Sequence, residues 1–218
     1  MLSDILRWGA KRPGQPDAPG ATSAPHGSEP IVPSKAFPKF LSAISNRAEP
    51  PVLIDFGPVI GTNVAFFGEH LGCKLFIEDL FADYERHARA GTLAELPATI
   101  DSRFHHADES VDGVLCWDVF DYLSKPAAQA LARQIIRMLR PGGSVMGFFC
   151  TSSVPHAAFT KYEIVDKTSL RHKHHPGAGG PKHAFLNRDI IKMFDSLIVA
   201  DSFLLKSNTR EILLRRRS

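Results

Sequence analysis

The chain has 218 residues, of which 44% are hydrophobic and 22% charged. This composition is typical of a globular protein, and the length suffices for one domain with tails. No apolar run approaches the roughly 18 to 20 residues that a membrane-spanning helix needs, and the first residues lack the apolar stretch of a signal peptide, so we expect a cytoplasmic protein without a membrane span. Cys73, Cys116 and Cys150 are odd in number and widely spaced, which excludes a disulfide framework and a CxxC metal site.

The formal net charge of +3 is unevenly distributed. The last fourteen residues contain five basic side chains and one acidic side chain, so the rest of the chain sums to −1. Proteins that bind large nucleic acids usually display a broad basic face. The charge therefore argues modestly against a large nucleic-acid partner and leaves a small molecule, a protein side chain or a modified nucleotide open as the substrate.

The first 34 residues predict two segments ahead of the domain. Residues 1–10 have apolar side chains at helical spacing, but a helix this short is not stable alone in water. Residues 11–34 contain six prolines and three glycines, which predicts a disordered linker. The short amphipathic segment could dock on a protein partner, on a membrane or on its own domain. We expect the folded domain to span residues 35–218.

Strands and helices alternate through most of the domain. The patterns predict a helix from Ala36, then strands at 51–56, 73–80, 111–120 and 144–150 with helices at 62–71, 81–90 and 126–139 between them. This order is typical of a doubly wound, mostly parallel α/β sheet, as in Rossmann-like folds.

The last third of the chain predicts a different arrangement. A strand is expected within 159–171, a flexible loop at 176–182 and a helix at 188–194. The two final strands, 197–207 and 210–217, follow each other directly, so they should form an antiparallel hairpin at one side of the sheet.

A candidate ligand site lies at the end of the first strand. Asp55 ends the strand, Gly57 follows it and Gly61 begins the next helix. A ligand can approach the backbone closely at such a turn and can face the helix N-terminus. Glu78 stands 21 residues after Gly57, at the end of the second strand, where a carboxylate can accept hydrogen bonds from ribose hydroxyls.

These motifs resemble the class I S-adenosylmethionine-dependent methyltransferases over about residues 50–150. The sequence VLIDFGPVIG resembles the glycine-rich first motif of the family, and FIED resembles its acid-ended second strand. SVDGVLCWDVFDYL and RMLRPGGSVMGFF resemble the fourth strand with its loop and the fifth strand with its preceding helix. The resemblance implies a mostly parallel seven-stranded sheet with a C-terminal antiparallel hairpin. In the first motif, Val59 replaces the middle glycine.

The resemblance also implies a cofactor, S-adenosylmethionine, and a set of residues around it. The first motif would surround the methionine part, and the acids of the second strand would hold the ribose. An acid and a serine ahead of the fourth strand would face the adenine, and the backbone at its end would approach the methionine part. The cofactor-binding candidates are Asp55, Gly57, Gly61, Glu78, Asp79, Asp101, Ser102 and Trp117.

The loop after the fourth strand supplies the catalytic candidates. Methyl transfer needs mainly positioning in a dry pocket, and a base only where the acceptor is protonated. Asp118 is the candidate base, and Tyr122 would orient the acceptor. Alternatively, Asp118 caps a helix and Tyr122 is a packing residue.

Four histidines, at positions 172, 174, 175 and 183, surround the glycine-rich segment. Without a carboxylate or cysteine to complete a ligand set, we expect no metal site there. The segment could instead be a lid over the acceptor pocket or a solvated loop.

Two functions remain open at this point. The first is an S-adenosylmethionine-dependent methyltransferase that transfers a methyl group to an unidentified acceptor by in-line displacement. The second is a catalytically inactive interaction or cofactor-sensing module that is recruited through residues 1–10.

Overall fold

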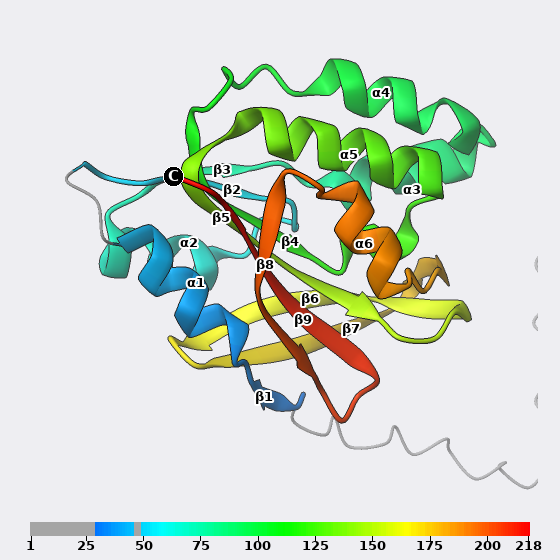
Figure 1. The fold of residues 1–218 in the computed structure, drawn as a ribbon. Coiled ribbons are helices and arrows are strands. Elements are labelled where there is room, and N and C mark those ends of the chain that lie inside the picture. Colours follow the sequence, from blue (N-terminus) through cyan, green and yellow to red (C-terminus); the bar gives the residue numbers. More distant parts are fainter. Residues whose placement is uncertain (1–28, 46–48) are drawn as a thin grey trace, which may run out of the picture.

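A six-stranded sheet with helices on both faces dominates the computed structural model, which describes residues 29–45 and 49–218 (Figure 1). The predicted amphipathic segment at 1–10 and most of the predicted linker lie outside the described residues. In chain order the first elements are β1 (Ile31–Pro33), α1 (Ala36–Ser45), β2 (Val52–Asp55), α2 (Gly61–Leu71), β3 (Lys74–Ile77), α3 (Leu80–Ala90), η1 (Leu93–Glu95), α4 (Leu96–Arg103) and β4 (Val111–Trp117). They are followed by η2 (Val119–Tyr122), α5 (Lys125–Met138), β5 (Leu139–Cys150), β6 (Val154–Asp166), β7 (Ser169–Lys182), α6 (Asn187–Met193), β8 (Leu197–Leu204) and β9 (Thr209–Arg216).

The main sheet has the strand order β3-β2-β4-β5-β9-β8. Neighbouring strands from β3 to β5 are parallel, whereas β9 is antiparallel to both β5 and β8. The predicted fold class and C-terminal hairpin are therefore confirmed. The predicted count of seven strands is wrong by one, because the segment between α3 and β4 forms η1 and α4. Leu96 and Ile100 are buried four residues apart, which is a helical spacing.

Side chains of the central strands alternate between two apolar cores. Leu53 and Leu115 pack with α1 and α2 on one face. Ile54, Val114 and Cys116 pack with α3, α4, α5 and α6 on the other. Figure 1 shows α3, α4 and α5 together on one side of the sheet and α1 and α2 on the opposite side. Both faces are therefore covered, as a parallel sheet requires.

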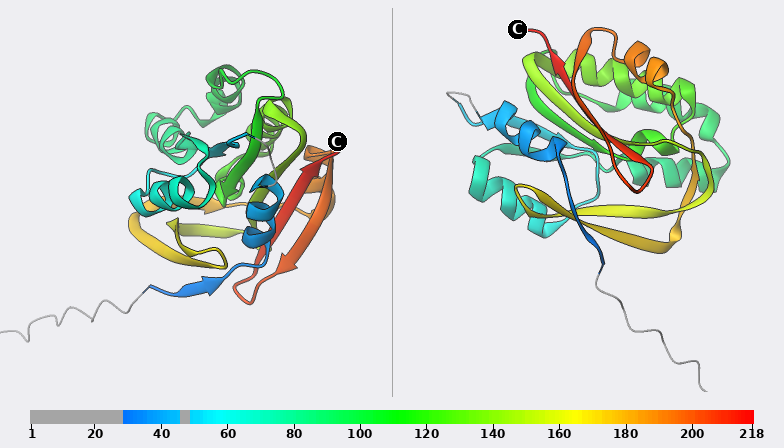
Figure 2. Two further views of the ribbon diagram at one scale, coloured as in Figure 1. Left: turned by 90° about the vertical axis from the view of Figure 1, so that its left-hand side faces the viewer. Right: turned by 60° about the horizontal axis from the view of Figure 1, so that its bottom comes forward.

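A second sheet of three strands, in the order β1-β7-β6, lies on the α2 side. Its strands β6 and β7 form a long hairpin, drawn in yellow in Figure 2. Two predictions are corrected here. Residues 176–182, expected as a loop, belong to β7, and Gly179, Gly180 and Lys182 among them pair with β6. Residues 31–33, expected as part of the linker, form β1 along β7, with Ile31 opposite Arg171.

The start of α1 is held by a side chain from the far end of the chain. The buried carboxylate of Glu211, on β9, accepts hydrogen bonds of 2.8 Å from the backbone N–H groups of Lys35 and Ala36. Ser34 Oγ accepts a further bond of 3.0 Å from the N–H of Phe37. These acceptors satisfy N–H groups that have no partner within the helix.

The helices of the described residues are short, and the longest, α5, has 14 residues. None of them combines the length and the apolar character needed to cross a membrane. The predicted cytoplasmic location remains a prediction.

Candidate cofactor and acceptor site

The turn between β2 and α2, residues 57–61, is built around Asp55. One oxygen of this carboxylate, Oδ1, accepts hydrogen bonds from the Gly57 N–H at 2.8 Å and from Trp117 Nε1 at 2.6 Å. A Cβ atom at position 57 would lie 2.9 Å from the Trp117 ring, so only glycine fits without displacing the ring. Gly61 begins α2, and no atom lies within 4 Å of the position that a Cβ atom would take there. Asp55, Gly57 and Trp117 are therefore brought together as predicted, and Gly61 marks the helix start.

Burial dominates the electrostatics of Asp55, whose exposed fraction is 2%. Loss of hydration raises the pKa of this carboxyl to about 6, although the hydrogen bonds from Gly57 and Trp117 oppose the shift. The negative charge of Asp79 adds to it. A buried carboxylate whose hydrogen bonds come from neutral donors, as those from Gly57 and Trp117 do, is costly for the fold at neutral pH.

Trp117 has an uncommon backbone conformation, with φ at +48°. The left-handed region is costly for a bulky side chain, so the surroundings must hold it there. Its ring is fixed by the bond to Asp55 and stacks on Tyr162 of β6, with 5.2 Å between ring centroids and 2° between planes. The side chain of Trp117, and not only its backbone, therefore faces the turn.

Glu78 lies at the end of β3, next to Asp55, and its N–H donates to the Asp55 carbonyl at 2.8 Å. Its carboxylate accepts bonds from Arg103 Nη1 at 2.7 Å and from His106 Nε2 at 3.0 Å. Asp79 accepts a bond from the N–H of Ala82 and so caps α3. Glu78 therefore lies beside the turn, whereas the carboxylate of Asp79 serves as the N-cap of α3.

Asp101 and Ser102, the candidates for the adenine end, are not brought to the turn. Both lie on α4, where the Asp101 carboxylate pairs with Arg133 of α5 at 2.8 Å. The Ser102 hydroxyl donates to carbonyls of its own helix. The helix that replaces the expected seventh strand turns both side chains away from the end of the sheet.

Asp118 and Tyr122 lie below the hairpin. Asp118 Oδ2 pairs with Lys182 Nζ of β7 at 2.6 Å, and Asp121 Oδ2 lies 3.8 Å from the same ammonium. Asp118 precedes η2 but makes no capping bond with its side chain. The Tyr122 hydroxyl donates to the carbonyl of Ala158 at 3.3 Å, and its ring is buried. Tyr122 therefore packs under the hairpin, in agreement with the alternative interpretation of this residue.

Burial and nearby charges also shift the pKa values of Asp121, Tyr122 and Lys182. Loss of hydration, followed by the charge of Asp118, raises the pKa of Asp121 to about 7, and Lys182 opposes this shift. Burial and the two carboxylates likewise raise the pKa of the Tyr122 hydroxyl. For Lys182, burial lowers the pKa but the charge and hydrogen bond of Asp118 outweigh it, so the net shift is upward.

The hairpin carries the predicted histidines. His172 packs against Tyr162 with ring centroids 4.9 Å apart, and His174 Nδ1 lies 3.1 Å from the Thr160 hydroxyl. Burial lowers the pKa of His172. Within the described part of the chain, no three side chains of histidine, cysteine, aspartate or glutamate are grouped as metal ligands. The segment is a strand that lies over the predicted site, which is the position expected of a lid.

Two small cavities adjoin the turn. The inner one has a volume of about 10 Å³ and lies between Gly57, Trp117, Asp118 and the β6 side chains Phe159 and Tyr162. An outer groove of about 210 Å³ is lined by Asp79, Glu85 and His175, among others. Both share Phe81 and Phe159, whose rings stack with centroids 3.6 Å apart. Ligand pockets typically measure about 300 to 1,000 Å³, so the hairpin side chains fill most of this site.

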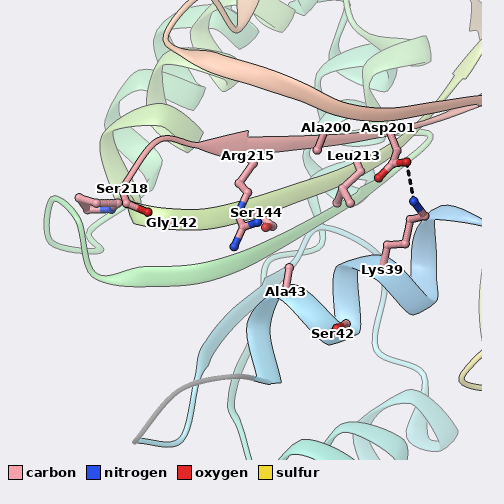
Figure 3. A pocket seen from close by; sticks show the side chains of 11 residues that line it. Lys39, Ser42, Ala43, Gly142, Ser144, Ala200, Asp201, Leu213, Arg215 and Ser218 are labelled. Atoms are coloured by element: carbon pink, nitrogen blue, oxygen red, sulfur yellow. Dashed lines mark hydrogen bonds and ion pairs between the residues drawn. The ribbon is translucent and has the colours of Figure 1, made fainter.

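A third cavity, of about 520 Å³, lies between α1 and the strands β5, β8 and β9 (Figure 3). Its lining includes Arg215, Ser144 and the ion pair of Lys39 with Asp201, whose atoms are 2.6 Å apart. Ser144 pairs with Gly113 near the beginning of β4, so this cavity lies toward the opposite end of the sheet from the glycine turn. No predicted cofactor or catalytic residue lines it.

Sequence reasoning missed the residues that the hairpin contributes. Phe159, Tyr162 and Lys182 reach Phe81, Trp117 and Asp118 from positions that are far away in the chain. Only the aromatic character of β6 and the basic residues of β7 hinted at a role.

Comparison with known protein families finds a match in the central part of the chain. Residues 55–147 match the family model of the methyltransferase domain. The matched segment therefore resembles the class I methyltransferases. The matched residues include the glycine turn, Glu78, Trp117 and Asp118, so the family predicted from these motifs is confirmed.

Solved structures of methyltransferases have a similar fold. One is the 1,6-didemethyltoxoflavin-N1-methyltransferase of Burkholderia thailandensis, with bound 1,6-didemethyltoxoflavin and S-adenosylhomocysteine. It is 16% identical, with a TM-score of 0.51 over 84% of this chain and 78% of that chain. Another is an S-adenosylmethionine-dependent methyltransferase of Mesorhizobium loti, 15% identical, with a TM-score of 0.50 over 81% and 95% of the two chains. At these identities the likeness concerns the fold. No curated protein matches the sequence.

Proposed function

We propose that this methyltransferase domain binds S-adenosylmethionine at the glycine turn and transfers its methyl group to a small-molecule acceptor. The observation that carries the proposal is the buried Asp55 carboxylate beside Gly57 in a domain of this family. The Burkholderia enzyme of the same fold was crystallised with S-adenosylhomocysteine and a small heterocyclic acceptor. This supports both parts of the proposal.

The side chains at the turn suit the parts of this cofactor. Asp55 has no cationic partner among its hydrogen bonds and would receive the ammonium of the methionine part. The N-terminus of α2 would face its carboxylate, with the open space at Gly61 allowing close approach. Glu78 would accept the ribose hydroxyls, in exchange for part of its bonding to Arg103 and His106. Bound there, the sulfonium supplies an activated methyl group and its own leaving group.

Binding requires that side chains of the hairpin leave the site. Phe159 and Tyr162 now narrow the inner cavity to about 10 Å³. Displacement of the stacked Phe81–Phe159 pair would join the inner cavity to the outer groove. The hairpin would then close over the bound ligands and exclude water, as lids do in many enzymes.

Val59, which replaces the family's middle glycine, is 71% exposed and lines neither of the two cavities beside the turn.

Isothermal titration of the full chain with S-adenosylmethionine and S-adenosylhomocysteine tests the proposal. We expect micromolar dissociation constants, and about tenfold weaker binding in Glu78→Gln, because the lost bonds to a charged acceptor contribute about 1.5 kcal/mol. Glu95→Gln, an exposed carboxylate on η1, is the matched control and should bind as the wild type does. Absence of binding up to millimolar ligand, in a folded sample free of copurified cofactor, would overturn the proposal. That result would favour the alternative in which the protein is a catalytically inactive interaction or cofactor-sensing module.

A further inference from the structure

The Lys182 cluster, formed by Asp118, Asp121, Tyr122 and Lys182, joins the hairpin to the loop after β4. Lys182 Nζ lies 2.6 Å from Asp118 Oδ2, 3.8 Å from Asp121 Oδ2 and 5.1 Å from the centroid of the Tyr122 ring. The Lys182 side chain is 14% exposed, and those of Asp118 and Asp121 are 3% and 1% exposed. An ammonium group is therefore held, nearly dry, by two carboxylates and an aromatic face.

The parts of this cluster that belong to the main sheet form a cation site without Lys182. Two buried carboxyl groups share one ammonium, so removal of that ammonium leaves a buried negative charge, shared by Asp118 and Asp121, without its cation. Asp121 is fixed by the backbone N–H of Cys150, at 3.0 and 3.1 Å from its two oxygens. The geometry of the site therefore does not depend on Lys182 alone.

The site also opens toward the proposed methyl donor. Asp118 lines the same inner cavity as Gly57 and Trp117. Lys182, by contrast, comes from the end of β7, in the hairpin whose β6 side chains fill the cavity. Withdrawal of its ammonium also requires that the end of β7 separates from η2, where the His183 N–H donates to the Asp121 carbonyl at 2.7 Å.

We propose that Asp118, Asp121 and Tyr122 bind the ammonium of an amine acceptor, and that Lys182 occupies this position while the hairpin is closed. The inference rests on the proposed function and names its substrate class. The bound ammonium first gives a proton to a carboxylate of the site, which frees the electron pair of its nitrogen. That pair forms the new N–CH3 bond as the S–CH3 bond breaks, with the S–CH3 electron pair going to sulfur.

While the hairpin is closed, Lys182 occupies the site as an ammonium, because the charge of Asp118 raises its pKa in spite of burial. Asp121, with a pKa of about 7, is suited to take a proton from a bound amine at neutral pH.

The test uses the full chain saturated with S-adenosylhomocysteine, after titration has shown that this ligand binds. Butylamine and phenethylamine are titrated against butanol and 2-phenylethanol, which have the same shape without the charge. Binding is followed by the fluorescence of the tryptophans, and hairpin opening by amide hydrogen exchange of β6 and β7. Failure of S-adenosylhomocysteine to bind would refute the proposed function, whereas failure of amines alone would refute this inference.

We expect each amine to bind at least tenfold more tightly than its alcohol and to increase exchange in the hairpin. Lys182→Met keeps the apolar stem and removes the competing ammonium, so amines should bind at least tenfold more tightly than in the wild type. Asp118→Asn should abolish the difference between amine and alcohol. The control Lys173→Met removes another cation of β7, which pairs with Glu163 instead, and should change neither result.

Equal binding of amines and alcohols by the wild type would overturn the inference, whatever the variants do. The same conclusion follows if Lys182→Met folds but gains no amine affinity, because the cluster then serves only to attach the hairpin. If Lys182→Met does not fold, two results still test the inference. They are the difference between amine and alcohol binding in the wild type and the loss of that difference in Asp118→Asn.

Discussion

Replacement of Asp55 by asparagine should change how stability depends on pH. In the folded chain the pKa of Asp55 is about 6, against an ordinary value of 3.8. The folded state therefore binds this proton more tightly than the unfolded state does. Stability from the group is greatest at low pH and is lost as the pH rises from about 4 to about 7.

The structure gives the size of this effect. A shift of about two pKa units corresponds to about 3 kcal/mol between the limits of low and high pH. The asparagine side chain of the variant would keep an oxygen that accepts from Gly57 and Trp117 but would carry no charge. The free energy of unfolding of the variant, relative to the wild type, should thus rise by about 2.5 kcal/mol between pH 4 and pH 8, because a small part of the loss precedes pH 4.

Urea unfolding at a series of pH values measures this difference directly. The change with pH is the informative quantity, because a constant offset from the buried amide cancels. Glu69→Gln, which replaces an exposed carboxylate on α2, is the control and should show less than about 0.5 kcal/mol of change over the same range. If the free energies of unfolding of Asp55→Asn and the wild type differ by the same amount at every pH, the cost assigned to burying the Asp55 charge is refuted.

Four further substitutions test other parts of the structure by the same unfolding assay or by titration with S-adenosylhomocysteine. Gly57→Ala should lose about 1–3 kcal/mol because its Cβ would meet the Trp117 ring, whereas Gly68→Ala, with open space on α2, should gain stability. Glu211→Gln should lose about 1–2 kcal/mol at the first turn of α1, and no loss would contradict its capping role. Asp101→Ala should change cofactor affinity less than about twofold, since its carboxylate faces α5; a loss of about tenfold would restore its predicted role.

The main sheet was predictable because its elements are defined locally. Apolar runs that end at glycine or an acid coincide with β2 and β3, and the amphipathic pattern expected at 126–139 coincides with α5 within one residue at each end. The direct succession of β8 and β9 likewise required only the short polar turn between them. Asp55, Gly57 and Glu78 could be placed because the ends of parallel strands meet at one edge of the sheet.

The hairpin was less predictable because distant partners stabilise it. Its glycines and prolines are typical of a loop, but Gly179, Gly180 and Lys182 pair with β6 and so make this segment part of a strand. A Cβ at position 180 would lie 2.5 Å from the Tyr84 hydroxyl oxygen, so a side chain there would displace Tyr84. The pairing of Lys182 with Asp118 spans 64 positions of sequence. No local pattern contains that information.

The structure of the full chain in complex with S-adenosylhomocysteine, determined by crystallography, tests the central claim most directly. Our account predicts the methionine part beside Asp55 and Gly57, the ribose at Glu78, and Phe159 and Tyr162 of the hairpin displaced from their present positions. Binding in the cavity beside Arg215, or at the turn with the hairpin unchanged, would contradict it.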